Sequence, residues 1–139
     1  MRIFMLGWIM LIFCYGQADA LTVRMDVIAQ IESSNNPKAY NSRTKATGLH
    51  QITPICLKDY NIYHKGNTYT MQDMYQPQAN KQVASWYINI RIPSMLNHYK
   101  HKVTIENVLT AYNWGISNVG KALPKETRDY IDKYNKLTK

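Results

Sequence analysis

The 139-residue sequence is poor in cysteine, glycine and acidic side chains. Its two cysteines, Cys14 and Cys56, are too few for a disulfide scaffold or a four-cysteine zinc site. Six glycines and five prolines exclude a collagen-like or low-complexity chain. With 45% apolar and 19% charged residues, the chain is also too apolar to be a disordered tail. These absences leave a small globular protein with room for one domain.

The N-terminal residues have the pattern of a secretory signal peptide. Arg2 gives a short positive start, residues 3–13 are almost wholly apolar, and residues 18–20 form an A-x-A cleavage site. We expect residues 1–20 to be a signal peptide and residues 21–139 to be one domain exported to the periplasm. The alternative is a retained membrane anchor, although the apolar run is short for a bilayer span. Lipidation of Cys14 is not expected, because the bulky Phe13 precedes it.

The charge of the chain is strongly positive. Seventeen basic residues outnumber nine acidic ones, which gives a net charge of +8. An exported basic domain is expected to meet a polyanion such as a cell-wall polymer, a membrane surface or an acidic partner. Nucleic acid is not expected, because the chain leaves the cytoplasm and its basic residues are scattered. The alternative is that this dispersed charge only solvates the surface.

Apolar residues recur at helical spacing along most of the chain. The first helix is expected to follow a cap at Thr22 and to end near residues 33–34. Later helices are expected from Pro54 with Ile55 and Leu57 buried, over 78–89 with Val83 and Ile90 on one side, after a cap at Thr104 as far as Gly115, and from Glu126. Pro93 is expected to interrupt or kink the helix over 78–89. No segment alternates as a strand, so the fold class is mostly α.

Glu32 differs from the other carboxylates in its local setting. It lies at the C-terminal end of an apolar helix, where the helix dipole disfavours negative charge, and it follows Ile31. Both features predict a raised pKa and a carboxyl that stays protonated near neutral pH. Such a group is suited to act as a general acid in glycosidic bond cleavage. A solvated surface glutamate is the alternative from this pattern alone.

Four short motifs follow in order along residues 23–135. Their sequences are ESS at 32–34, ATGLHQI at 46–52, AYNWG at 111–115 and PKETRDY at 124–130. This series resembles the soluble lytic transglycosylase (SLT) domain family of the lysozyme-like superfamily, whose motifs are ES, GLMQ, AYNxG and ETxxY. The resemblance implies a single helical domain with a lysozyme-like fold and a substrate cleft.

The resemblance also implies the site residues. Glu32 matches the family's catalytic acid, and five residues match positions that bind or face the substrate: Ser42, Gln51, Tyr112, Asn113 and Tyr130. From the residues alone, Tyr112 and Tyr130 also suit core-facing helical positions, and Gln51 suits the closing of a turn.

His50 departs from the family pattern, because it replaces the methionine of GLMQ. It is expected to be a polar wall residue, with a substrate contact or a second titrating group as the alternatives. The remaining histidines, His64, His98 and His101, show no metal-ligand spacing with a carboxylate or cysteine. We expect no metal and no cofactor.

The resemblance implies cleavage of the β-1,4 bond between N-acetylmuramic acid and N-acetylglucosamine in peptidoglycan, with a 1,6-anhydromuramyl product. The chain is similar to the small family members that open the wall locally for a secretion, conjugation or pilus apparatus. We therefore expect components of such an apparatus as partners, and we expect the protein to be a monomer. The alternatives are a muramidase that uses water and a non-catalytic wall-binding assembly factor. The single candidate carboxylate favours the transglycosylase over the muramidase, because hydrolytic glycosidases normally use two carboxylates.

Overall fold

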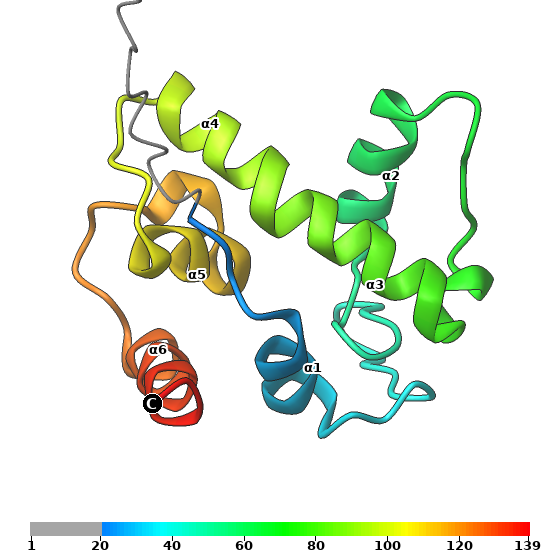
Figure 1. Ribbon diagram of the computed structural model, residues 1–139, viewed down its shortest axis with the longest axis horizontal. Coiled ribbons are helices and arrows are strands. Elements are labelled where there is room, and N and C mark those ends of the chain that lie inside the picture. Colours follow the sequence, from blue (N-terminus) through cyan, green and yellow to red (C-terminus); the bar gives the residue numbers. More distant parts are fainter. Residues whose placement is uncertain (1–20) are drawn as a thin grey trace, which may run out of the picture.

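The computed structural model describes residues 21–139, so the predicted signal peptide lies outside the described residues. Within this range the chain is helical, and β pairing is limited to isolated bridges of Thr47 with Tyr40 and Ile52. The elements are α1 (Met25–Ser33), α2 (Pro54–Tyr63), η1 (Gln72–Tyr75), α3 (Pro77–Trp86), η2 (Tyr87–Arg91), α4 (Ile92–His98), α5 (Ile105–Trp114), η3 (Ile116–Asn118) and α6 (Lys125–Leu137). The prediction of a mostly α fold is confirmed (Figure 1).

Helix ends follow the capping residues of the sequence in two of three predicted cases. The Thr104 hydroxyl accepts a hydrogen bond from the Asn107 N–H, and Gly115 ends α5 with a φ of 98°. The predicted cap at Thr22 is wrong, because α1 begins at Met25 after an extended Arg24. The reason is tertiary: the Val23 N–H donates to Asn89 Oδ1 at 2.8 Å, which holds this segment against η2.

One long helical rod runs through α3, η2 and α4 and links the two sides of the molecule (Figure 1). The predicted interruption near Pro93 is present, but it lies just before the proline, and the rod continues beyond it. A π-helical turn, η2, comes directly before α4, and Pro93 occupies the first turn of α4, where a helix tolerates proline.

The π turn changes which side chains of the rod are buried. The buried residues Ala84, Ile88, Ile92 and Leu96 recur at every fourth position. In a pure α-helix this spacing would drift by about 40° at each step, and the wider π turn reduces the drift. Ile90, predicted to share the face of Val83, is therefore 61% exposed.

Two clusters of buried side chains form the core. The larger one joins α1, η2, α4, α5 and α6, and the smaller one joins α2, η1 and α3. Met25 and Tyr87 pack against both clusters. Leu57 is buried in the smaller cluster as predicted, but Ile55 is 79% exposed and does not belong to it. No helix among residues 21–139 is long and apolar enough to cross a bilayer.

The loop between α1 and α2 is held against α3 by one buried amide. Asn80 is fully buried and its Nδ2 donates to the carbonyl oxygens of Thr47 and Met74, each at 2.9 Å. This close approach requires Gly48, which has a φ of 77°. A Cβ at position 48 would lie 2.1 Å from the Met74 oxygen and 2.4 Å from Asn80 Nδ2.

We therefore expect Gly48→Ala to lower the free energy of unfolding by about 3 kcal/mol, because the backbone conformation and the missing space both oppose a side chain. Gly66→Ala is the matched control, since nothing lies within 4 Å of a Cβ there. Its effect should stay within about 0.5 kcal/mol. Urea denaturation of both variants measures the difference, and equal stabilities would contradict the role given to Gly48.

Candidate active site

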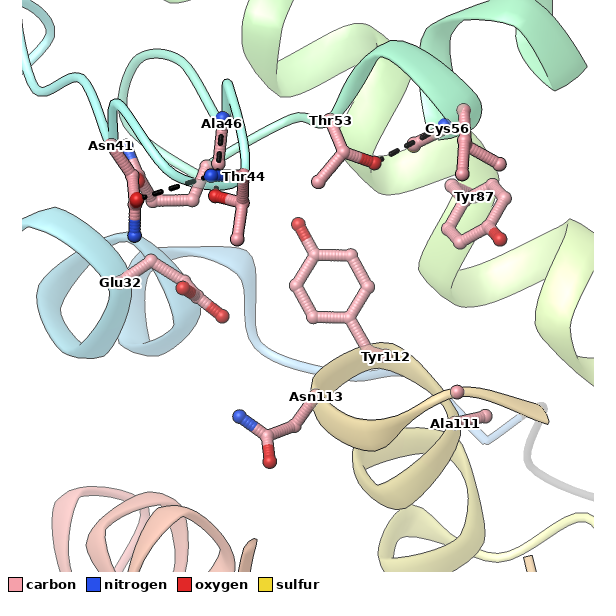
Figure 2. A pocket seen from close by; sticks show the side chains of 13 residues that line it. Glu32, Asn41, Thr44, Ala46, Thr53, Cys56, Tyr87, Ala111, Tyr112 and Asn113 are labelled. Atoms are coloured by element: carbon pink, nitrogen blue, oxygen red, sulfur yellow. Dashed lines mark hydrogen bonds between the residues drawn. The ribbon is translucent and has the colours of Figure 1, made fainter. Parts of the chain in front are cut away.

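Glu32 is the penultimate residue of α1, and the chain turns away sharply just after it. Ser34 and Asn35 have positive φ values of 52° and 61°, which end the helix. Ser33 Oγ lies 2.8 Å from the Leu49 carbonyl oxygen and 3.1 Å from that of Ala29. The end of α1 is thus fixed to the loop that carries Gln51, and the Glu32 side chain faces the space between α1 and α5 (Figure 2).

A cleft of about 350 Å³ opens beside Glu32 where the two core clusters meet. Figure 2 shows Glu32 on one wall, with the Tyr112 ring pointing into the middle and Asn113 below it. The cleft is lined by Glu32, Asn41, Thr44, Ala46, Gln51, Thr53, Ile55, Cys56, Tyr87, Ala111, Tyr112, Asn113 and Gly115. Of these described residues, Glu32 is the one that carries a carboxyl group.

Burial raises the pKa of Glu32 to about 7. The hydroxyl of Tyr130 donates a hydrogen bond to Glu32 Oε1 at 2.8 Å, which stabilises the carboxylate and partly opposes this rise. The predicted direction is confirmed, and of the two predicted causes burial is the one that raises this pKa. At neutral pH this carboxyl is divided between its protonated and ionised forms.

Tyr112 and Tyr130 hold their protons firmly. Burial raises the pKa of each hydroxyl well above its ordinary value, and the nearby Glu32 adds to the rise. The Tyr112 hydroxyl donates to the His50 carbonyl oxygen, so its proton is already engaged. Tyr130 is buried and lies against Glu32 from α6. Both tyrosines are therefore hydrogen-bond donors and not bases in this site.

The two amide side chains keep one polar end free toward the cleft. Gln51 Nε2 donates to the carbonyl oxygens of Gly48 at 3.0 Å and Ala39 at 3.4 Å. Asn113 Oδ1 accepts from the Thr127 hydroxyl at 2.9 Å. These bonds commit the amide nitrogen of Gln51 and the amide oxygen of Asn113. They leave an acceptor on Gln51 and a donor on Asn113 available to a ligand.

The structure places five of the six sequence-predicted residues around this site, with Tyr130 reaching it through Glu32. Ser42 lies on an exposed turn and does not line the cleft; its neighbour Asn41 does. Asn41 Oδ1 accepts from the backbone N–H groups of Arg43 and Thr44, which shapes this turn. The role of Ser42 stays a prediction.

Sequence reasoning missed other cleft residues, notably Thr44, Thr53 and Tyr87. The cap position of Thr53 before Pro54 was a usable signal, since it places the start of α2 at the cleft. Tyr87 had no such signal, because its direction depends on the π turn. Cys56 also lines the cleft, and burial raises the pKa of its thiol far above the ordinary range.

A second, smaller depression continues on the other side of Glu32. Its volume is about 260 Å³, and Glu32 and Asn113 line both spaces. Glu126, Asp129 and Lys133 of α6 line its far side. Glu32 therefore borders two open spaces. No group of three or more His, Cys, Asp and Glu residues within 21–139 is arranged to bind a metal ion.

Comparison with known proteins agrees with this geometry. The family model described as "Transglycosylase SLT domain" matches residues 19–135. The chain belongs to this family. It is also similar to the membrane-bound lytic murein transglycosylase E of Buchnera aphidicola, with 29% identity over 114 residues. That match covers 81% of this chain and 51% of the relative, so the chain spans about half the length of the curated relative. No solved structure matches the chain.

The raised pKa of Glu32 in this SLT domain has a consequence for stability. The buried carboxylate form is disfavoured, so the contribution of Glu32 is fully present below pH 4.5 and is lost as the pH rises through about 7. We expect Glu32→Gln to be more stable than the wild type by about 3 kcal/mol at about pH 9 and nearly equal at about pH 4. Urea denaturation across this pH range measures the difference. A constant difference between the two proteins would mean that Glu32 titrates normally.

Removing the Tyr130 hydroxyl should move the pKa of Glu32 further upward. Burial remains in Tyr130→Phe, whereas the hydrogen bond that lowers this pKa is lost. Tyr134→Phe is the matched control: Tyr134 lies one turn along α6 and accepts its hydrogen bond from the Arg24 N–H instead. Carboxyl ¹³C shifts followed by NMR give both pKa values. An unchanged or lower value in Tyr130→Phe would contradict the assignment of this contact.

Proposed function

We propose that this protein is a peptidoglycan lytic transglycosylase with Glu32 as its catalytic acid and base. The observation that carries the proposal is one carboxyl of raised pKa on the wall of a cleft whose other described lining residues have no carboxyl. Membership of the SLT family and the similarity to a lytic murein transglycosylase support the same activity.

The proposed reaction uses Glu32 twice. The protonated carboxyl gives its proton to the glycosidic oxygen between N-acetylmuramic acid and N-acetylglucosamine as the C1–O bond breaks. The acetamido oxygen of the substrate stabilises C1, as in substrate-assisted glycosidases. The resulting carboxylate takes the proton of the muramyl C6 hydroxyl, whose oxygen attacks C1 and closes the 1,6-anhydro ring. Because this nucleophile belongs to the substrate, no second carboxylate and no positioned water are needed.

The other cleft residues bind and orient the sugar in this scheme. The Tyr112 ring covers an apolar sugar face, and Gln51 and Asn113 offer their free acceptor and donor to hydroxyl and acetamido groups. The hydrogen bond from Tyr130 of α6 lowers the pKa of Glu32 and so limits its rise. Ser42 is proposed to meet substrate that extends beyond the Asn41 turn. The positive charge of the chain favours approach to an anionic wall.

Glu32→Gln should reduce release of soluble muropeptides from purified sacculi by at least about 10²-fold, because it removes acid catalysis. Glu106→Gln is the control: Glu106 is an exposed carboxylate in the first turn of α5 and does not line the cleft. Mass spectrometry of the wild-type products identifies the reaction. Anhydro-muropeptides support the proposal, products heavier by one water indicate a muramidase, and full activity of Glu32→Gln would reject this acid.

We also propose that the enzyme acts in the cell envelope as a monomer and opens the wall locally for an assembling secretion, conjugation or pilus apparatus. The export pattern of residues 1–20 and the compact cleft-bearing unit of residues 21–139 support this role. Cells that carry Glu32→Gln in place of the native protein should grow normally but assemble the apparatus poorly. A general growth or cell-separation defect with intact assembly would instead indicate a housekeeping role.

A further inference from the structure

His50 lies fully inside the protein where the loop of residues 47–52 meets α1, α3 and α5. It is 2% exposed. Its Nδ1 lies 2.8 Å from Asn80 Oδ1, and its Nε2 lies 3.0 Å from the Met25 carbonyl oxygen. Its backbone N–H also donates to Asn80 Oδ1, at 3.0 Å. Both ring nitrogens therefore face oxygen atoms.

Neither of these two oxygens can be exchanged for a donor. The Asn80 amide is fixed because its Nδ2 donates to the carbonyl oxygens of Thr47 and Met74, and rotation would set oxygen against oxygen. The Met25 oxygen belongs to the backbone and can only accept. A neutral imidazole has one N–H and one lone pair, so it would place that lone pair against an oxygen. Only the imidazolium donates to both partners.

The segment Leu49–His50 connects this ring to the proposed catalytic groups. The His50 carbonyl accepts from the Tyr112 hydroxyl in the cleft, and the Leu49 carbonyl lies 2.8 Å from Ser33 Oγ beside Glu32. Since the His50 ring contacts Met25 at the start of α1, the loop holds this helix at both ends.

We propose that His50 is a positioning residue for Glu32 and Tyr112, and that it fills this role completely as an imidazolium. Loss of one ring proton removes one of its two ring contacts, loosens α1 against α3 and lowers the rate. This inference rests on the proposed transglycosylase function.

The surroundings of His50 set the direction of its titration. Burial lowers its pKa below the ordinary value of 6.5, and Lys81 on α3 adds to the lowering, while the two oxygen contacts act in the opposite sense. From α1, the exposed Asp26 is paired with Arg24 at 2.6 Å, and from α5 the Tyr112 hydroxyl faces the His50 carbonyl. The imidazolium, which donates to both oxygens, is therefore populated as the pH falls. As the pH rises, it is lost before Glu32 ionises near pH 7.

NMR of the ¹⁵N-histidine-labelled protein tests the ring directly. We expect both His50 ring nitrogens to carry protons at about pH 4.5 and one at about pH 8. The Glu32 and Tyr112 signals should shift together with this step even if the protein releases no product. A His50 ring that stays neutral at about pH 4, or that titrates without moving these signals, would overturn the proposal.

Kinetics on purified sacculi separate positioning from simple stability. As the pH rises through the His50 titration, the kcat of the wild type should fall about 3- to 10-fold, which is the effect of one hydrogen bond. As the pH rises further and Glu32 ionises, the remaining activity should be lost. His50→Met should lack the first step, with a lower kcat at about pH 5 and KM within about 2-fold. His98→Met is the control, since His98 is exposed at the end of α4.

Further variants keep this test decisive. If His50→Met does not fold, His50→Gln takes its place, because glutamine keeps one donor but cannot titrate. A folded variant with the wild-type pH profile would overturn the proposal. A wild type that forms no anhydro-muropeptides at any pH would reject the proposed function instead, and the NMR titration would still decide the role of His50.

Discussion

The arrangement of this molecule depends on a carboxyl group taken out of water between two helices. Glu32 at the end of α1 accepts a hydrogen bond from the hydroxyl of Tyr130 of α6, 98 residues away in the chain. Burial raises its pKa to about 7, while the tyrosine limits the rise. The balance of these two effects gives a group that can release and recover a proton near neutral pH. The helices around it keep that balance by holding both side chains in place.

Much of the fold follows from local signals in the sequence. Capping by Thr53 and Thr104, the stop at Gly115 and the apolar face of the last helix all act over a few residues, and the structure has each of them. The predictions that proved wrong did so because of tertiary contacts and helix geometry. The start of α1 is set by a hydrogen bond to Asn89, which is distant in the sequence. The exposure of Ile90 follows from a π turn that the periodicity of the sequence does not predict.

The candidate site divides in the same way. Glu32 and Tyr112 stand in short motifs that predict their place on the cleft, and both are found there. The places of Thr44 and Tyr87 on the cleft could not be predicted from the sequence. Thr44 depends on a turn that the Asn41 side chain stabilises by hydrogen bonds, and the direction of Tyr87 depends on the π turn in the long helical rod. His50 was expected to be a wall residue, and its burial between two acceptors depends on Asn80, thirty residues further along.

The thiol of Cys56 has a consequence for handling the protein. It is the free cysteine of the described residues, and it is buried beside the cleft. Because thiolates are the reactive species and burial suppresses this one, oxidants and alkylating reagents should find it inert while the fold is intact. Labelling of Cys56 therefore reports unfolding, and the protein can be prepared in reducing or oxidising buffers without intermolecular cross-links through this residue.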